Sequence, residues 1–339
     1  MPTLLITSPL EAEHATRLAG LDPRLTVAYA PDLLPVAQFK GDHGGAPLTR
    51  TPAQQARWEG LLGEADILWG VPKPEDAAHA RKLRWIQSTN TGAGPAAARL
   101  HRPDVLVTTA RGIHARPLAE FVFMALLAHW RGLDELRASQ RAHRWGRGCM
   151  DEVAGRTMVI LGAGDLARGC ARIAQALDMH VIAVARDVSV QRAHAGLFNE
   201  TLPSGELHAA MARADAFVIT VPHTPLTDRM VDAAALAALP RGAAFVNIGR
   251  GLVVDEPALI EALRSGQVGF AALDVTAVEP LPGDSPLWDM ANVLISPHSA
   301  STAPGENGRV VDIFAHNLAC WLDGRLGEMW NVLDVARLY

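Results

Sequence analysis

Four polar residues in the C-terminal half of the chain have the types that proton transfer on an anionic substrate requires. Arg250, Asp274 and His298 each follow a short apolar run, and Glu279 comes soon after Asp274. A guanidinium can bind a carboxylate and polarise a carbonyl, and an imidazole can exchange a proton near neutral pH. A carboxylate beside that imidazole would orient it and favour its protonated form. Each of these residue types is common on protein surfaces. Whether the four residues form a catalytic site therefore depends on the elements that position them.

The stretch 157–186, TMVILGAGDLARGCARIAQALDMHVIAVAR, predicts the element around which the rest of the chain is organised. The pattern predicts a strand, a helix and a strand at residues 157–161, 165–177 and 180–185. This order is typical of a dinucleotide site: Gly162 allows the tight bend, Gly164 lets backbone approach a pyrophosphate, and Ala167 is small enough for close helix packing. The alternative interpretation is a structural turn without a ligand.

The end of the second predicted strand bears on which dinucleotide binds. An NAD site usually places Asp or Glu about 20 residues after the glycines, to accept hydrogen bonds from the adenosine ribose. Ala185 stands there and Arg186 follows it, which favours NADP because an arginine can hold a 2′-phosphate. Asp187 leaves NAD possible, since it could pair with Arg186 or supply the acid one residue later.

Strands alternate with helices in both parts of the chain. The first hundred residues predict an α/β layer of parallel strands, and residues 157–297 predict a doubly wound domain. Residues 118–141 predict one long helix, and residues 187–202 a connection without a strand. Arg250, Asp274 and His298 therefore share the carboxyl edge of the second sheet, where a nicotinamide would lie. Hydride transfer to a 2-keto acid needs this set of groups at that place.

Length and composition limit the classes of protein. A chain of 339 residues predicts two domains, and 49% hydrophobic residues suffice for a large core. A net charge of −5 without a Lys/Arg cluster argues against nucleic acid and anionic membranes as partners. The longest apolar stretch, 121–130, is too short to cross a bilayer.

The termini and cysteines indicate a location. The N-terminus, MPTLLITSPL, lacks a basic start and a cleavage site, so we expect no signal peptide and a cytoplasmic protein. Three scattered cysteines without CxxC spacing predict reduced, packed thiols.

The chain resembles the D-isomer-specific 2-hydroxyacid dehydrogenases over nearly its whole length. The motifs that carry the resemblance are TNTGAGP, ARGIHARPLAE, LGAGDLA, VPHTPLT, NIGRG, AALDVTAVEPLP and NVLISPH, of which the last three together are the most specific. The resemblance implies two Rossmann/flavodoxin-like parallel-sheet domains. A dinucleotide-binding domain, residues 109–297, is inserted into a split substrate domain made of residues 1–108 and 298–339.

The resemblance also implies roles for single residues. Arg250 would bind the substrate carboxylate and carbonyl, His298 would be the acid/base, and Glu279 its partner. The amides of Ala93 and Gly94 would complete the carboxylate site. Asp274 would contact the nicotinamide carboxamide. The candidate cofactor-binding residues in these motifs are Gly162, Gly164, Asp165, Leu166, Ala185, Arg186, Pro222, Thr227, Ile248 and Asp274.

Two departures from the family pattern limit this carry-over. GAGPAAA lacks an Asp that often follows the second glycine, and Ala110 stands where an Asn is usual. About 40 residues follow His298, so we expect no C-terminal regulatory domain.

The NADP-type loop is most similar to that of glyoxylate/hydroxypyruvate reductases, so we expect reduction of such small 2-keto acids to D-2-hydroxy acids by NAD(P)H. The resemblance also implies a homodimer joined through the nucleotide domains, with the long helix taking part. One alternative is a non-catalytic, nucleotide-sensing protein of the corepressor type on the same fold. Another is a metal enzyme using some of the 13 histidines, but no HExxH or paired-ligand spacing supports a metal site.

Overall fold

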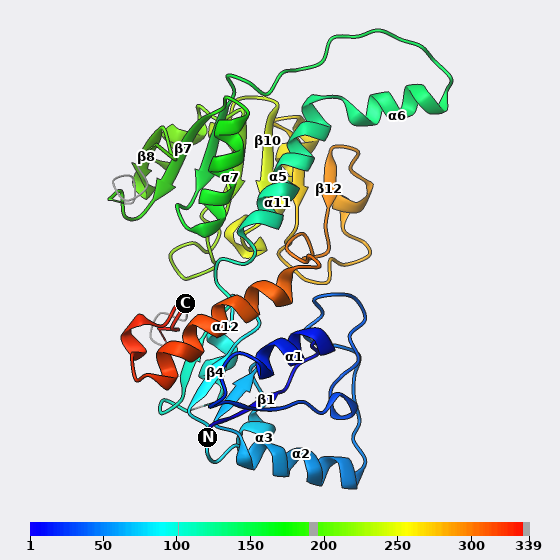
Figure 1. Ribbon diagram of the computed structural model, residues 1–339. Coiled ribbons are helices and arrows are strands. Elements are labelled where there is room, and N and C mark those ends of the chain that lie inside the picture. Colours follow the sequence, from blue (N-terminus) through cyan, green and yellow to red (C-terminus); the bar gives the residue numbers. More distant parts are fainter. Residues whose placement is uncertain (101, 190–195, 335–339) are drawn as a thin grey trace. The chain divides into compact units, whose positions relative to one another are not determined.

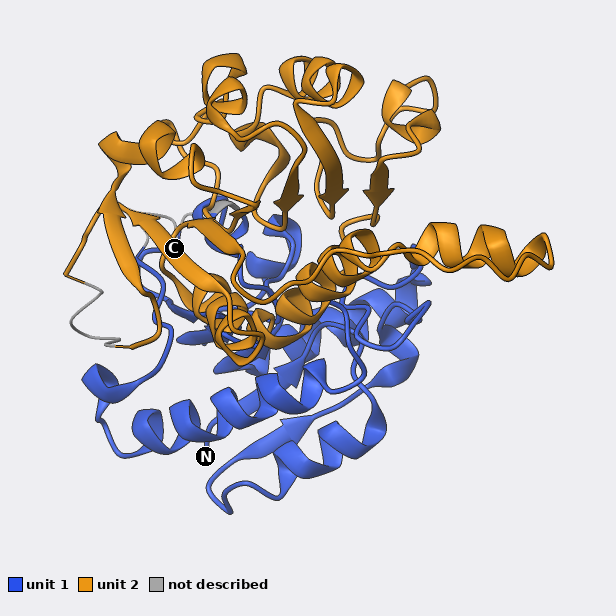
Figure 2. Ribbon diagram, turned by 90° about the horizontal axis from the view of Figure 1, so that it is seen from above, with its two compact units in different colours: residues 1–113, 302–339 blue, residues 114–301 orange. Residues whose placement is uncertain are grey.

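The computed structural model describes residues 1–100, 102–189 and 196–334 (Figure 1). The chain divides into two compact units, residues 1–113 with 302–339 and residues 114–301 (Figure 2). The second unit is inserted into the first, and both are built on parallel sheets, which confirms the predicted α/β class with an inserted domain. The units change at 113/114 and 301/302, whereas the sequence placed the domain boundaries at 108/109 and 297/298.

Unit 1 is a five-stranded parallel sheet of order β2-β1-β3-β4-β5. Its strands are β1 (Thr3–Ile6), β2 (Thr26–Ala28), β3 (Ile67–Trp69), β4 (Trp85–Gln87) and β5 (Leu106–Thr108). Its helices are α1 (Ala12–Ala19), α2 (Pro52–Glu64), α3 (Pro74–Ala77), α4 (Gly94–Ala98) and α12 (Glu306–Leu322), with 3-10 turns at Pro31–Leu33 and Leu326–Glu328.

Aromatic packing places the C-terminal helix in unit 1. Phe314 of α12 stacks on Trp85 of β4, with ring centroids 4.9 Å apart, and meets Trp69 edge to face. All three side chains are fully buried. Burying large rings against a sheet stabilises this association through their apolar area, which is why the last helix returns to the first sheet.

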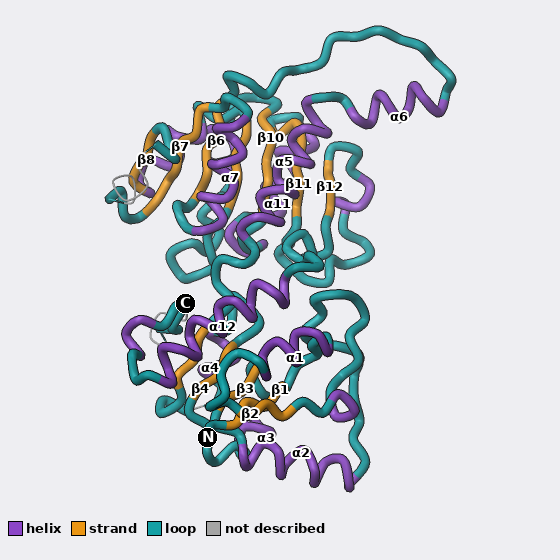
Figure 3. Tube along the Cα trace, in the orientation of Figure 1, coloured by secondary structure: helices purple, strands orange, loops and turns teal. Residues whose placement is uncertain are grey.

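Unit 2 is a seven-stranded parallel sheet of order β12-β11-β10-β9-β6-β7-β8 (Figure 3). Its strands are β6 (Thr157–Leu161), β7 (His180–Ala185), β8 (Glu200–Pro203), β9 (Ala216–Ile219), β10 (Ala243–Asn247), β11 (Val268–Leu273) and β12 (Val293–Ile295). Its helices are α5 (Ala115–Trp130), α6 (Leu133–Arg141), α7 (Asp165–Ala176), α9 (Leu207–Met211), α10 (Ala233–Ala238) and α11 (Glu256–Ser265). Short 3-10 turns lie at Ser204–Glu206, Gly251–Val253 and Pro286–Asp289.

Strand β6 shows why this sheet is central to unit 2. Val159 and Leu161 belong to a hydrophobic cluster on one face, whereas Met158 and Ile160 belong to a second cluster on the other face. A strand that is buried on both faces has a continuous apolar sequence, and residues 158–161 of β6 form such a run.

Three sequence-based expectations were wrong. The predicted long helix 118–141 is two helices, because Gly132 adopts a left-handed conformation with φ of 60° between α5 and α6. The predicted connection 187–202 contains β8, which pairs in parallel with β7. Cys149 is exposed rather than packed, while Cys170 and Cys320 are buried.

The described helices include none that combines the length and the apolar character needed to cross a membrane.

Candidate active site

The glycine turn after β6 has the geometry that a pyrophosphate needs. Gly162 has φ of 114°, and a Cβ there would lie 2.4 Å from the Thr220 hydroxyl oxygen, so the position requires glycine. Gly164 is the N-cap of α7, and a Cβ there would point into open space. The first-turn amides of a 12-residue helix have no intrahelical acceptors and can bind phosphate oxygens. These residues fit a dinucleotide.

Residues beside this turn fix the start of α7. Asp165 forms an ion pair with Arg168, and Leu166 is partly buried against the cluster on that face of the sheet. Gly169 lies so close to α5 that a Cβ would meet the Ala115 carbonyl oxygen at 2.6 Å. The sequence interpretation used Ala167 as the small packing residue, and Ala167 is fully buried, but Gly169 sets the approach of the two helices.

The residues that bear on cofactor choice lie at the end of β7. Ala185 is the last strand residue and Arg186 is exposed directly after it. The Asp187 carboxylate accepts a 2.8 Å hydrogen bond from the Ser189 backbone N–H. The hydrogen bonds of Ser189 lower the pKa of Asp187, so this side chain is a carboxylate at neutral pH.

The VPHTPLT segment after β9 is a turn closed by Thr227. Its hydroxyl donates to the Pro222 carbonyl oxygen at 2.7 Å and accepts from the Thr224 backbone N–H at 2.8 Å. Both candidate residues of this motif, Pro222 and Thr227, thus form one closed turn at the carboxyl end of a central strand.

The NIGRG segment after β10 requires both of its glycines. A Cβ on Gly249 would lie 2.7 Å from the Val221 carbonyl oxygen, and one on Gly251 would lie 1.9 Å from that of Thr276. The buried Asn247 side chain accepts from the Gly249 N–H at 3.0 Å and donates to the Arg250 carbonyl oxygen at 3.1 Å. Ile248 is buried and Arg250 is exposed, and the Arg250 Nη1 donates to the Gly249 carbonyl oxygen of the same turn at 2.7 Å.

Asp274, directly after β11, holds the segment that carries His298. Its buried Oδ1 accepts hydrogen bonds from the Ser296 hydroxyl at 2.6 Å and from the backbone N–H groups of Ser299 and Ala300 at 3.0 and 2.9 Å. The His298 N–H donates to the Asp274 carbonyl oxygen at 2.9 Å. One carboxylate therefore fixes the loop on both sides of the histidine.

His298 and Glu279 form a close pair. The Nδ1 atom of His298 lies 2.6 Å from Oε2 of Glu279, and Oε1 of Glu279 accepts from the Thr276 N–H at 3.2 Å. The Ala277 N–H donates to the Glu256 carboxylate at 2.8 Å, which fixes this loop to the start of α11. Because Nδ1 faces the carboxylate, the other ring nitrogen of the histidine is the one available for exchange with a substrate.

These residues meet because three neighbouring strands end at one edge. Strands β10, β11 and β12 are adjacent in the sheet, and Arg250, Asp274 and His298 follow them. The supporting residues Asn247, Thr276, Glu256 and Ser296 were not singled out from the sequence. Three of them stand inside quoted motifs, Asn247 in NIGRG, Thr276 in AALDVTAVEPLP and Ser296 in NVLISPH, and their place in these motifs was the available signal.

The two remaining candidates belong to unit 1. Ala93 is the N-cap of α4 and Gly94 is its first residue, and both are buried at the carboxyl end of β4.

Within the described part of the chain, no group of three or more His, Cys, Asp or Glu is placed to hold a metal ion.

Comparisons with known proteins identify the family of this chain. Residues 123–300 match the family model for the NAD-binding domain of D-isomer specific 2-hydroxyacid dehydrogenases. A D-3-phosphoglycerate dehydrogenase of Mycobacterium leprae is 35% identical over 277 residues, which are 76% of this chain and 51% of that protein. A glyoxylate reductase of Korarchaeum cryptofilum is 31% identical over 228 residues, 66% of this chain and 68% of that protein.

A solved structure extends the match. The NADPH-dependent glyoxylate/hydroxypyruvate reductase of Sinorhizobium meliloti, in complex with NADP and sulfate, is 26% identical, with a TM-score of 0.78 and 100% of both chains covered. The chain spans about half the length of the phosphoglycerate dehydrogenase, with 51% of that protein covered. The predicted resemblance is confirmed: this chain belongs to the D-isomer specific 2-hydroxyacid dehydrogenase family, whose members are NAD(P)-dependent oxidoreductases acting on CH–OH groups.

Proposed function

We propose that this protein reduces glyoxylate, hydroxypyruvate or a similarly small 2-keto acid to the D-2-hydroxy acid with NADPH. The observation that carries the proposal is the pair of His298 and Glu279, 2.6 Å apart, on loops adjacent to the turn that presents Arg250. An acid, its carboxylate partner and a cation at one sheet edge are what reduction of a keto acid requires.

Each side chain has a distinct task in this proposal. The exposed guanidinium of Arg250 binds the substrate carboxylate and polarises the keto oxygen through a forked contact. His298 donates a proton from Nε2 to that oxygen as negative charge develops on it, and Glu279 holds the ring by Nδ1. The backbone N–H groups of Ala93 and Gly94, at the start of α4 in unit 1, are the second group that we propose for carboxylate binding. NADPH, when bound, supplies the hydride.

Asp274 acts as a positioning residue for His298. The Oδ1 atom accepts three hydrogen bonds from residues 296–300, so the loop keeps the histidine in place. The contact of Asp274 with the nicotinamide carboxamide stays a prediction and would use the other carboxylate oxygen.

NADPH is the proposed cofactor because Ala185 offers no carboxylate to the adenosine ribose and Arg186 can pair with a 2′-phosphate. The NADP bound by the Sinorhizobium meliloti reductase supports this choice. The names of that enzyme and of the Korarchaeum cryptofilum relative support glyoxylate and hydroxypyruvate as substrates.

We also propose a homodimer formed through unit 2. Exposed apolar side chains are concentrated on α5, α6 and the arm that follows, which projects from the rest of unit 2 in Figure 2. They include Met124, Leu136 and Trp145, of which Trp145 is 97% exposed. Exposed apolar patches of this kind mark interaction surfaces. Sedimentation velocity at several protein concentrations tests this assembly, and a monomer throughout would contradict it. The cytoplasmic location stays a prediction.

The test of activity is a panel of keto acids assayed with NADPH and with NADH. The panel contains glyoxylate, hydroxypyruvate, pyruvate and 3-phosphohydroxypyruvate, the last because of the match to phosphoglycerate dehydrogenases. We expect the highest kcat/KM for glyoxylate or hydroxypyruvate with NADPH. A preference for 3-phosphohydroxypyruvate would refute the proposed substrate. Tight NADPH binding without turnover of any keto acid would instead favour the nucleotide-sensing alternative.

A further inference from the structure

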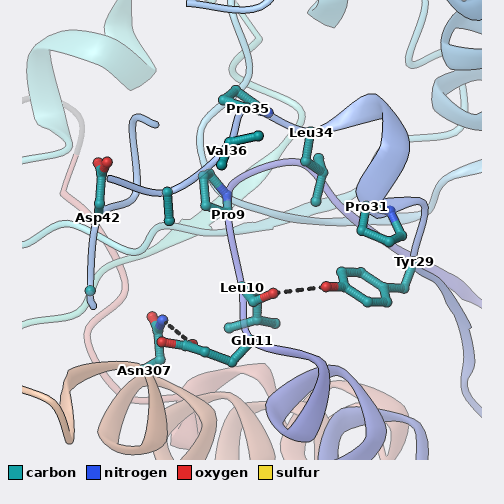
Figure 4. A pocket seen from close by; sticks show the side chains of 12 residues that line it. Pro9, Leu10, Glu11, Tyr29, Pro31, Leu34, Pro35, Val36, Asp42 and Asn307 are labelled. Atoms are coloured by element: carbon teal, nitrogen blue, oxygen red, sulfur yellow. Dashed lines mark hydrogen bonds between the residues drawn. The ribbon is translucent and has the colours of Figure 1, made fainter. Parts of the chain in front are cut away.

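Unit 1 contains a cavity that the proposed reaction does not use. It lies between the carboxyl ends of β1 and β2, the segment 34–42 and the start of α12, and it measures about 300 Å³ (Figure 4). This volume is at the lower end of the range of small-molecule pockets, about 300–1,000 Å³. Much of the wall is apolar and rigid, with contributions from Pro9, Leu10, Pro31, Leu34 and Pro35.

The polar groups on the wall offer acceptors to a ligand. Glu11 and Asp42 contribute carboxylates, and the Tyr29 hydroxyl already donates to the Leu10 carbonyl oxygen at 2.9 Å. Among the described residues that line the cavity, none is Lys, Arg or His. A bound molecule would therefore meet negative charge without a compensating cation on the wall.

Asn307 is the observation that points to a ligand. Its side chain is 3% exposed, and its Nδ2 donates to the Glu11 carboxylate at 2.7 Å. Its Oδ1 has no hydrogen-bond partner in the described part of the chain. Figure 4 shows the carboxamide rising from α12 toward the cavity, beside Glu11. A buried carbonyl without a donor destabilises the fold, so a ligand that supplies an N–H group would remove that penalty.

Asp42 keeps a fixed charge on the opposite wall. Burial disfavours its carboxylate, but hydrogen bonds from the backbone N–H groups of Gln38, Gly45 and Gly44, at 2.9, 2.9 and 3.0 Å, outweigh burial and lower its pKa. The side chain is thus a carboxylate at neutral pH and adds to the negative potential of the cavity.

We propose that this cavity binds a small organic ammonium ion with an apolar body. The ammonium would donate to the Asn307 Oδ1 atom and to the Glu11 carboxylate, which lie side by side, and the apolar body would contact the proline and leucine side chains. A carboxylic acid is excluded by the two carboxylates, and a neutral alcohol would satisfy Asn307 without gaining from the charge.

The test is a binding titration of the full chain by calorimetry, in phosphate buffer without cofactor or substrate. The probes are benzylamine, which is a cation at pH 7, and its isosteres benzyl alcohol and benzoate. We expect benzylamine to bind more tightly than benzyl alcohol and benzoate not to bind. Because catalysis is not measured, the result stands apart from the success or failure of the proposed reductase activity.

Two variants locate the site. Asn307→Leu removes the unpartnered acceptor, but it also leaves Glu11 without its donor and could affect folding. Glu11→Gln is the second variant, because it removes the charge and keeps an acceptor for Asn307. We expect Glu11→Gln to weaken benzylamine binding by about 10- to 100-fold, the loss of one charge-assisted hydrogen bond.

The matched control is Glu13→Gln in the first turn of α1, two residues after Glu11, because its side chain is 80% exposed and outside the cavity. It should leave the affinity unchanged. The proposal is overturned if no probe binds, if benzoate or benzyl alcohol binds as tightly as benzylamine, or if Glu11→Gln has the same affinity as the wild-type protein.

Discussion

Gly251 approaches Thr276 so closely that a Cβ on the glycine would lie 1.9 Å from the threonine carbonyl oxygen. This contact joins the turn that carries Arg250 to the loop that carries Glu279. Its physical cause is the pairing of β10 with β11, whose carboxyl ends lie next to each other. The position of Arg250 relative to Glu279 is thus determined by the close backbone approach of Gly251 to Thr276.

Gly251→Ala should therefore impair catalysis more than cofactor binding. The added methyl group must push the two loops apart, at a cost of about 1–3 kcal/mol for overpacking, and so displace Arg250 from the Glu279 loop. Thermal unfolding, kcat and NADPH affinity of the purified variant measure the effect. Gly283→Ala is the control, because nothing lies within 4 Å of its added Cβ. Equal kcat in both variants would contradict the positioning argument.

His298→Ala should lower kcat by about 10²- to 10⁴-fold, because the keto oxygen would lose its proton donor. Glu279→Gln should cause a smaller loss, since the amide can still contact Nδ1 but without the charge. Steady-state kinetics at several pH values measure both. His208→Ala, at an exposed position on α9, serves as the control. If His298→Ala kept near-normal kcat from about pH 6 to 9, His298 would be removed from the proposed mechanism.

Arg250→Lys keeps the positive charge but loses the planar fork, so KM for glyoxylate should rise and kcat should fall. NADPH affinity should change little, because the guanidinium lies on the NIGRG turn after β10 and the phosphate-binding glycines lie after β6. Arg264→Lys, an exposed residue paired with Glu261, is the matched control. Weaker NADPH binding with an unchanged KM for glyoxylate would show that Arg250 serves the cofactor.

Much of this site could be predicted from the sequence because parallel strands bring their carboxyl ends together. The apolar runs before Arg250, Asp274 and His298 sufficed to place all three at one edge. The contacts of Asp274 could not be predicted, since its three donors come from residues 296–300 and depend on how that loop folds.

The errors in the fold have local causes. Good helix-forming residues stand on both sides of Gly132, so the periodic pattern continued through a position where the backbone turns left-handed. β8 was missed because Glu200–Pro203 is short and partly polar. It lies at the edge of the sheet, where a strand is not buried on both faces and needs no continuous apolar run.

Stability should depend on pH through Glu200. Hydrogen bonds from Arg213, at 2.8 and 2.5 Å, and from His180, at 2.9 Å, lower the pKa of Glu200 to about 2. A carboxyl group with a lowered folded-state pKa stabilises the fold above its unfolded pKa of 4.5, and this stabilisation is lost as the pH falls toward 2.

Glu200→Gln should therefore lower the free energy of unfolding at neutral pH. Because the side chain is 36% exposed, solvent screening limits the expected loss to on the order of 1 kcal/mol. The difference from the wild-type protein should narrow below pH 4.5. Urea unfolding at pH 7 and at lower pH measures this difference in the free energy of unfolding. Glu152→Gln, at an exposed position, is the control. A difference that stayed constant with pH would rule out the charge as its cause.

Cofactor preference should depend on the two residues at the end of β7. The 2′-phosphate of NADPH carries close to two negative charges, and one well-formed contact with Arg186 is worth roughly 1.5–3 kcal/mol, or about 10- to 100-fold in affinity. NADH gains no ribose contact from Ala185. Wild-type kcat/KM should therefore be higher with NADPH than with NADH.

Combining Ala185→Asp with Arg186→Ile should invert this preference. The new carboxylate would repel the 2′-phosphate and accept hydrogen bonds from the ribose hydroxyls, while the phosphate would lose its cationic partner. Asp187 is the competing acid, and its carboxylate accepts from the Ser189 N–H at 2.8 Å, so the single variant Asp187→Asn is the matched control. The measurement is kcat/KM for both cofactors in all three proteins at one ionic strength. If the wild-type protein preferred NADH and Asp187→Asn abolished that preference, Asp187 would hold the ribose and the NADP assignment would be wrong.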